Sequence, residues 1–166
     1  ECILFFCPTF REILNVHFLK LLQRIFLKMR IIDLFSGVGG LTFGFYYRKY
    51  KDHFVRNRKN QFVFANEYNP FAAKAYSENY PDIPMKNCDI KSLKESDIRK
   101  WIGSEPVDLI IGGPPCQSFS TVGQRNYDEK AQLYTEYLRV LKIARPKMFL
   151  FENVRGILSM REIFYK

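Results

Sequence analysis

From Met29 onward, short apolar segments alternate with segments of helical pattern, and this alternation constrains the fold more than any other feature of the chain. The apolar segments favour strands, and the segments between them place apolar residues at helical spacing. The predicted strands span residues 30–35, 61–66, 85–89, 107–111 and 147–151. The predicted helices span residues 40–50, 70–79, 94–102 and 130–144.

Strands that alternate with helices form a parallel sheet whose two faces are both covered. Right-handed crossovers then give a doubly wound α/β domain with a mostly parallel, Rossmann-like sheet. Ligands of such domains bind at the carboxyl ends of the strands, near the point where the strand order reverses. We therefore expect the functional residues in the loops that follow the predicted strands.

The composition supports a folded and basic chain. Its 166 residues suffice for one domain or a substantial part of a larger one, and 47% apolar residues can form a sizeable core. The net charge of +9 favours a polyanionic partner or an acidic surface. Six Lys or Arg residues and one Asp give +5 within residues 46–60. We interpret residues 48–60 as a loop-like stretch with a solvated face.

The cysteine and histidine content argues against metal and disulfides. Four cysteines form no C-x-x-C pair and there are two histidines, so a structural zinc site lacks ligands and no metal is expected. The absence of a cysteine-dense framework favours a reduced, intracellular protein with a cytoplasmic location, at the nucleoid if the source is prokaryotic.

Residues 1–28 form a predicted upstream helical extension of unclear role. Their apolar residues fit a helix with a broad apolar face, which either packs on the domain or has no fold of its own. A membrane-surface helix is the alternative, because basic residues flank this face. No run approaches the roughly 18 apolar residues of a membrane span, and no membrane partner is expected.

A glycine-rich turn follows the first predicted strand, in the sequence DLFSGVGG. Glycines at a strand-to-helix turn let the backbone approach a ligand, and the helix start directs free N–H groups towards it. A merely tight connection is an equal alternative. The lysine of a phosphate-binding loop is missing, which disfavours ATP.

Acidic residues follow the next two strands. Glu67 can accept hydrogen bonds from both ribose hydroxyls, and the adjacent Tyr68 can cover an adenine. Asp89 can receive an exocyclic amine, although capping the following turn is equally plausible. Together with the glycine turn, these positions suit an adenosine-containing cofactor.

The segment GGPPCQSFS after the fourth strand is the most specific motif. Its two prolines restrict the backbone just before Cys116, which favours a displayed nucleophile over an inert core cysteine. Glu152 follows the fifth strand and is placed to act as an acid beside this thiol.

In this order and spacing, DLFSGVGG, ANEYNPFAAKAY, NCDI, GGPPCQSFS and FENVRG resemble the catalytic half of the DNA cytosine-5 methyltransferases. The resemblance covers roughly residues 29–160. It implies a Rossmann-like methyltransferase sheet, truncated here after about five strands, the cofactor S-adenosylmethionine and double-stranded DNA as substrate. Residues 29–166 would then be a partial catalytic domain without a target recognition domain.

The resemblance also implies roles for individual residues. Cys116 matches the nucleophile and Glu152 the acid. The matches to cofactor-binding positions are Phe35, Ser36, Gly37, Gly39, Glu67, Tyr68, Asp89, Ile90 and Pro114. The expected DNA contacts are Gln117, Ser118, Ser120, Arg125 and Asn153, with Lys130 and Arg155 as further candidates.

Family members continue beyond the E-N-V motif with a Gln-x-Arg-x-Arg segment, a DNA-reading domain and a closing Gly-Asn motif, none of which this sequence contains. We therefore expect an incomplete pocket, an exposed apolar edge at strand 147–151, weak cofactor affinity and little activity for this chain alone. A complementing carboxy-terminal chain is a possible partner. The alternatives are a non-catalytic remnant or interaction module that retains the fold, and a tRNA cytosine-5 methyltransferase.

Overall fold

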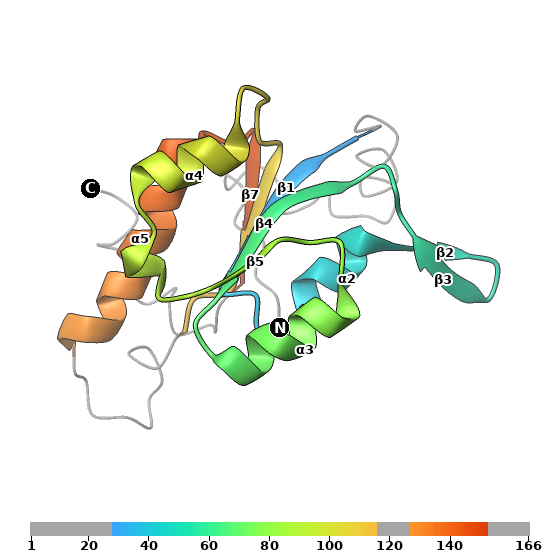
Figure 1. Ribbon diagram of the computed structural model, residues 1–166, viewed down its shortest axis with the longest axis horizontal. Coiled ribbons are helices and arrows are strands. Elements are labelled where there is room, and N and C mark those ends of the chain that lie inside the picture. The colour runs from blue at the N-terminus through green and yellow to red at the C-terminus, as the bar shows by residue number, and fades with distance from the viewer. Residues whose placement is uncertain (1–27, 116–126, 153–166) are drawn as a thin grey trace, which may run out of the picture.

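A five-stranded parallel sheet forms the centre of the protein in a computed structural model, which describes residues 28–115 and 127–152 (Figure 1). Its strands are β1 (Arg30–Leu34), β4 (Gln61–Glu67), β5 (Met85–Asn87), β6 (Leu109–Gly112) and β7 (Met148–Phe151). The spatial order is β5-β4-β1-β6-β7, and all four neighbouring pairs are parallel. The strand order therefore reverses at β1, between β4 on one side and β6 on the other.

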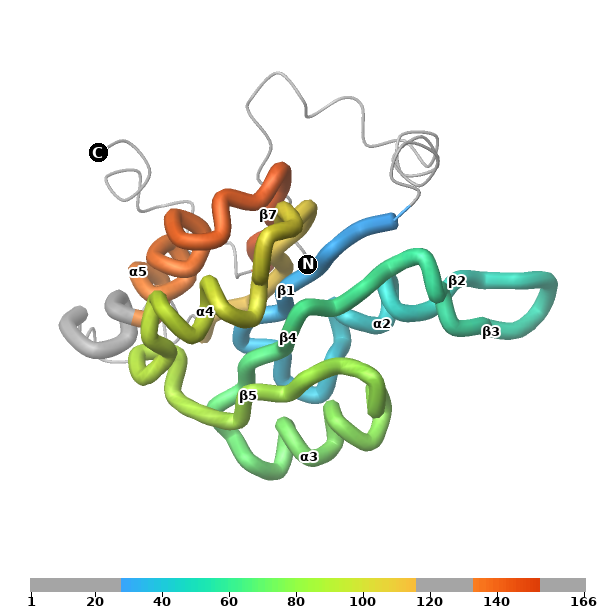
Figure 2. The backbone as a smooth tube through the Cα atoms, turned by 45° about the horizontal axis from the view of Figure 1, so that its top comes forward, coloured from blue at the N-terminus to red at the C-terminus, as the bar shows by residue number. Residues whose placement is uncertain are grey.

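Helices cover both faces of this sheet, as Figures 1 and 2 show. The helices α2 (Gly40–Tyr46) and α3 (Pro70–Asn79) lie on one face. The other face carries α4 (Glu95–Ile102), α5 (Tyr127–Ala144) and the short 3-10 helix η2 (Ile90–Ser92). The predicted doubly wound α/β fold is thus confirmed.

Each face of the sheet has its own core, because successive strand residues point to opposite sides. Ile32 and Leu34 of β1 pack towards α4 and α5, whereas Ile31 packs towards α2 and α3. The pairing register of β1 with β4 shifts between Ile31 and Ile32. Because of this shift, Phe62 of β4 packs on the α2 and α3 side and Phe64 on the α4 and α5 side.

The helix boundaries follow local chemistry at two clear points. The Asn69 side chain accepts hydrogen bonds from the N–H groups of Phe71 and Ala72, and Pro70 occupies the first turn of α3. The Asp89 side chain accepts from the N–H of Lys91 and so caps η2.

The predicted helix 40–50 is wrong beyond Tyr46. The chain turns there into an antiparallel hairpin formed by β2 (Tyr47–Tyr50) and β3 (His53–Arg56), within the stretch that we expected to be loop-like. Tyrosines and the following His-Phe-Val segment fit a pleated surface, and pairing satisfies their backbone groups. Lys51 makes the tight turn possible with a φ of 53°.

The other predicted elements are found with small shifts at their ends. None of the helices that the structure describes is long and apolar enough to cross a membrane. The prediction of a helix before Met29 concerns residues outside the described part of the chain.

Candidate active site

The turn between β1 and α2 is built from unusual backbone conformations. Phe35 and Gly37 both have a φ of 55°, and Gly39 has a φ of 94°. A side chain at Gly39 would lie 2.1 Å from the Tyr80 ring, so this position requires glycine. A Cβ added at Gly37 would meet nothing within 4 Å, which leaves the backbone open to close approach.

Glu67, at the carboxyl end of β4, holds this turn in place. One carboxylate oxygen accepts a hydrogen bond from the N–H of Gly37 at 2.8 Å, and the other accepts from the N–H of Asn69 at 2.8 Å. The structure thus brings together two residues that the sequence placed in one site. A carboxylate has about four acceptor positions, so two remain available for further donors such as ribose hydroxyls.

The neighbouring candidates differ in how far they face solvent. The Tyr68 ring is 73% exposed, so its face is open to a flat ligand. The Asp89 carboxylate is exposed and caps η2. Capping of the following turn is the role that the sequence offered as an alternative to binding an exocyclic amine. The Ile90 side chain is 2% exposed in the core, which leaves its main chain for any ligand contact.

Glu152 lies beside the loop that follows β6. Its N–H donates to the carbonyl of Gly112 at 2.9 Å, which continues the pairing of β7 with β6. A Cβ on Gly113 would lie only 2.9 Å from one Glu152 carboxylate oxygen. The acid therefore stands against the start of the Gly-Gly-Pro-Pro segment, in which Pro114 is buried and Pro115 exposed.

Several predicted site residues lie outside the described part of the chain. They are the nucleophile candidate and the expected DNA contacts: Cys116, Gln117, Ser118, Ser120, Arg125 and Asn153. Their roles stay predictions.

A buried polar cluster that the sequence motifs do not indicate lies beneath the glycine turn. Asp33 is fully buried in β1, and the Thr42 hydroxyl, which lies 2.8 Å from the Tyr76 hydroxyl, donates to its carboxylate. Burial raises the pKa of Asp33 to about 7, with Glu67 adding a smaller electrostatic contribution. Within the described residues, Asp33 Oδ1 and the nearby Ser36 Oγ have no hydrogen-bond partner. The only signal in the sequence is an aspartate inside an apolar strand.

A parallel sheet whose order reverses at β1, with a glycine turn after β1, an acid after β4 and another after β7, defines a Rossmann-like α/β domain with its site at the switch point. The chain belongs to the C-5 cytosine-specific DNA methylase family, whose model matches residues 29–164.

Curated relatives agree with this assignment. The Type II methyltransferase M.AgeI from Thalassovita gelatinovora is 42% identical over 135 residues, which cover 80% of this chain and 29% of the relative. M.NgoPII from Neisseria gonorrhoeae is 40% identical over 135 residues, covering 80% of this chain and 35% of the relative. The chain therefore spans only about a third of the length of these relatives.

A solved structure shares the fold as well. It is described as a DNA modification methyltransferase encoded within a prophage of E. coli, with a TM-score of 0.65 and 32% identity. The match covers 82% of this chain and 36% of that one.

Proposed function

We propose that this chain supplies the cofactor-binding and nucleophile-bearing part of an enzyme that methylates carbon 5 of cytosine in double-stranded DNA. Membership of the C-5 cytosine-specific DNA methylase family supports this proposal. The structural observation that carries it is the position of Glu152 beside Gly113, because the loop that starts at Gly113 leads directly to Cys116.

The residues at the switch point fit S-adenosylmethionine as the cofactor. Open space at Gly37, spare acceptor positions on Glu67, the exposed Tyr68 ring and the unpartnered Ser36 Oγ suit a ligand with a ribose, an adenine and polar groups. When bound, S-adenosylmethionine supplies an electrophilic methyl group. The residues that would hold it are Phe35, Ser36, Gly37, Gly39, Glu67, Tyr68, Asp89, Ile90 and Pro114.

The protein's own chemistry acts on the cytosine ring. Carbon 5 is a poor nucleophile until the Cys116 thiolate adds to carbon 6 and converts the ring to an enamine. Glu152 favours this addition by donating a proton or a strong hydrogen bond to ring nitrogen 3. After carbon 5 has gained the methyl group, loss of its proton to a base and expulsion of the thiolate restore the aromatic ring.

The base must leave the duplex for this reaction, because carbon 6 is not accessible to a thiol within stacked base pairs. We assign the contacts with the flipped cytosine and the surrounding strand to Gln117, Ser118, Ser120, Arg125 and Asn153. Residues 29–166 would act as one partial catalytic domain.

A chimaera tests the proposal. The matched segment of M.AgeI is replaced by the corresponding segment of this chain, and the product is mixed with S-adenosylmethionine and a duplex in which 5-fluorocytosine replaces cytosine. Because fluorine cannot leave as a proton does, we expect a covalent protein–DNA adduct that survives denaturing electrophoresis.

Two variants give the controls for this trapping experiment. Cys116→Ser should abolish the adduct and Glu152→Gln should slow its formation by about 100-fold, since general acid catalysis contributes about this much. An adduct that persists in Cys116→Ser would contradict the proposed nucleophile. If unaltered M.AgeI forms the adduct and the chimaera does not, the chain is a non-catalytic remnant.

A further inference from the structure

The β2–β3 hairpin projects from the sheet as a separate arm (Figures 1 and 2). Directly paired residues of an antiparallel hairpin point to the same face. Tyr47 and Lys49 therefore share one face with their partners Arg56 and Phe54, and Arg48 and Tyr50 share the other face with Val55 and His53.

The first face anchors the arm to the domain. The Phe43 ring of α2 lies 5.1 Å from the ring of Tyr47 and 5.1 Å from that of Phe54. At the base of the hairpin, Arg56 lies over the Tyr46 ring at 3.8 Å and forms an ion pair of 2.9 Å with Asp82. These contacts hold the hairpin in a defined position.

The second face gathers positive charge around one aromatic ring. Arg48 lies 5.6 Å and Lys51 5.8 Å from the centre of the exposed Tyr50 ring, and the His53 ring lies 5.9 Å from it. Attraction to the ring holds the two cations close together. The paired strand residues on this face include no acid.

Positive charge continues beyond the hairpin at Arg58 and Lys59. Of the ion pairs in the described part of the chain, none involves the cations Arg48, Lys49, Lys51, Arg58 and Lys59. The only acid between residues 47 and 60 is Asp52.

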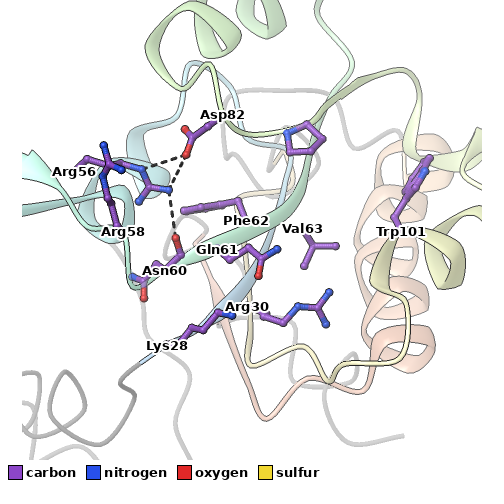
Figure 3. Close-up of a pocket in the computed structure, with 11 residues that line it drawn as sticks. Lys28, Arg30, Arg56, Arg58, Asn60, Gln61, Phe62, Val63, Asp82 and Trp101 are labelled. Atoms are coloured by element: carbon purple, nitrogen blue, oxygen red, sulfur yellow. Dashed lines mark hydrogen bonds and ion pairs between the residues drawn. The ribbon is translucent and has the colours of Figure 1, made fainter.

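A cavity of about 460 Å³ lies next to the base of the hairpin, and Figure 3 shows Lys28, Arg56 and Arg58 among its lining residues. The lining also includes one acid, Asp82, which is the ion-pair partner of Arg56. Arg30 and Gln61, the first residues of β1 and β4, also line it, so it lies at the amino-terminal edge of the sheet. Because β4 has seven residues, this edge is roughly 20 Å from Glu67 and the candidate active site.

We propose that the β2–β3 hairpin and the adjoining cationic cavity form a second DNA contact, which binds the phosphate backbone of a duplex without regard to sequence. Phosphates would relieve the repulsion between the clustered cations, and the release of condensed counterions would drive binding. This contact lies at the opposite edge of the sheet from the candidate active site, so it would hold a different segment of DNA from the one bound there. Such a tether would keep the protein on long DNA between methylation events.

Binding to a duplex that contains only A·T pairs tests this inference separately from methyl transfer, because such a duplex has no cytosine. We would measure the fluorescence anisotropy of a labelled duplex of about 30 base pairs with the full chain at several salt concentrations. The variant Arg48→Ala/Lys51→Ala/Arg58→Ala, which removes two cations of the second face and one of the cavity, should bind at least about tenfold more weakly. The slope of log affinity against log salt should fall by about 2 to 3, since each lost phosphate contact removes about 0.9.

The matched control removes three exposed cations elsewhere, in Lys74→Ala/Lys94→Ala/Lys100→Ala. We expect this variant to keep most of the affinity, whereas an equal loss in both triple variants would overturn the proposal. The single charge reversal Arg48→Glu, which replaces one cation of the second face and removes no backbone pairing group, should weaken binding in the same direction. If the hairpin variants lose binding to phosphatidylglycerol vesicles but not to DNA, the surface binds lipid headgroups and the proposal is wrong.

Discussion

The N–H of Gly37 donates a hydrogen bond of 2.8 Å to the carboxylate of Glu67, across 30 residues of sequence. This bond joins the turn after β1 to the end of β4, the two positions expected to hold a nucleoside. Because the second carboxylate oxygen accepts from Asn69, the acid is fixed in orientation before any ligand binds. Such preorganisation lowers the cost of binding.

Glu67→Gln should weaken S-adenosylmethionine binding by about tenfold and lower the unfolding free energy by about 1 kcal/mol. The glutamine amide has only one oxygen acceptor, so one of the two N–H groups, that of Gly37 or that of Asn69, would face an NH₂ donor and lose its hydrogen bond. Isothermal titration calorimetry and urea unfolding measure the two effects. The control Glu78→Gln changes an exposed acid of α3 and should leave both quantities unchanged.

Tyr68→Ala should reduce cofactor affinity without a comparable loss of stability. The ring is 73% exposed, so its removal should change the unfolding free energy by less than about 0.5 kcal/mol. Loss of stacking on an adenine should cost about 1 kcal/mol, or roughly fivefold in Kd. Phe71→Ala, at a position that is 83% exposed and has no proposed role, provides the comparison. Equal affinities in the two variants would contradict stacking by Tyr68.

Gly113→Ala should impair adduct formation in the chimaera by about 100-fold while leaving the fold intact. The new methyl group would lie 2.9 Å from a Glu152 carboxylate oxygen, and the flexible end of that side chain can move away at little cost. Gly44→Ala is the matched control, because nothing lies within 4 Å of its added Cβ in α2. It should keep adduct formation and stabilise the protein by about 1 kcal/mol, since alanine favours helix.

Asp33→Asn should flatten the dependence of stability on pH. The carboxyl has a pKa of about 7 in the fold and an ordinary value when unfolded, so the folded state binds the proton more tightly. Its contribution to stability is therefore present below pH ~4 and is lost as pH rises to about 7, a change on the order of 4 kcal/mol. Urea unfolding between pH 4.5 and 8 measures this difference. Parallel profiles for the two proteins would show that Asp33 does not titrate in this range.

The sequence predicted the parts of the site that depend on local pattern. Short apolar strands interleaved with amphipathic helices determine a parallel sheet, and its connection rules place the following loops at one edge. Gly37, Glu67 and Glu152 were assigned to that edge because each directly follows a strand. The motif GGPPCQSFS resembles the DNA cytosine-5 methyltransferases, and this resemblance predicted Cys116 as the nucleophile.

The tertiary structure decided what depends on contacts between distant residues. Tyr47–Tyr50 continues a helical pattern locally, but packing of Phe43 against Phe54 and pairing with His53–Arg56 make it a strand. The raised pKa of Asp33 arises from its burial beneath α2 and α3, and the position of Glu152 beside Gly113 arises from the pairing of β7 with β6. Periodicity reports which face of an element is apolar. Which partner that face meets is determined by the free energy of the whole fold.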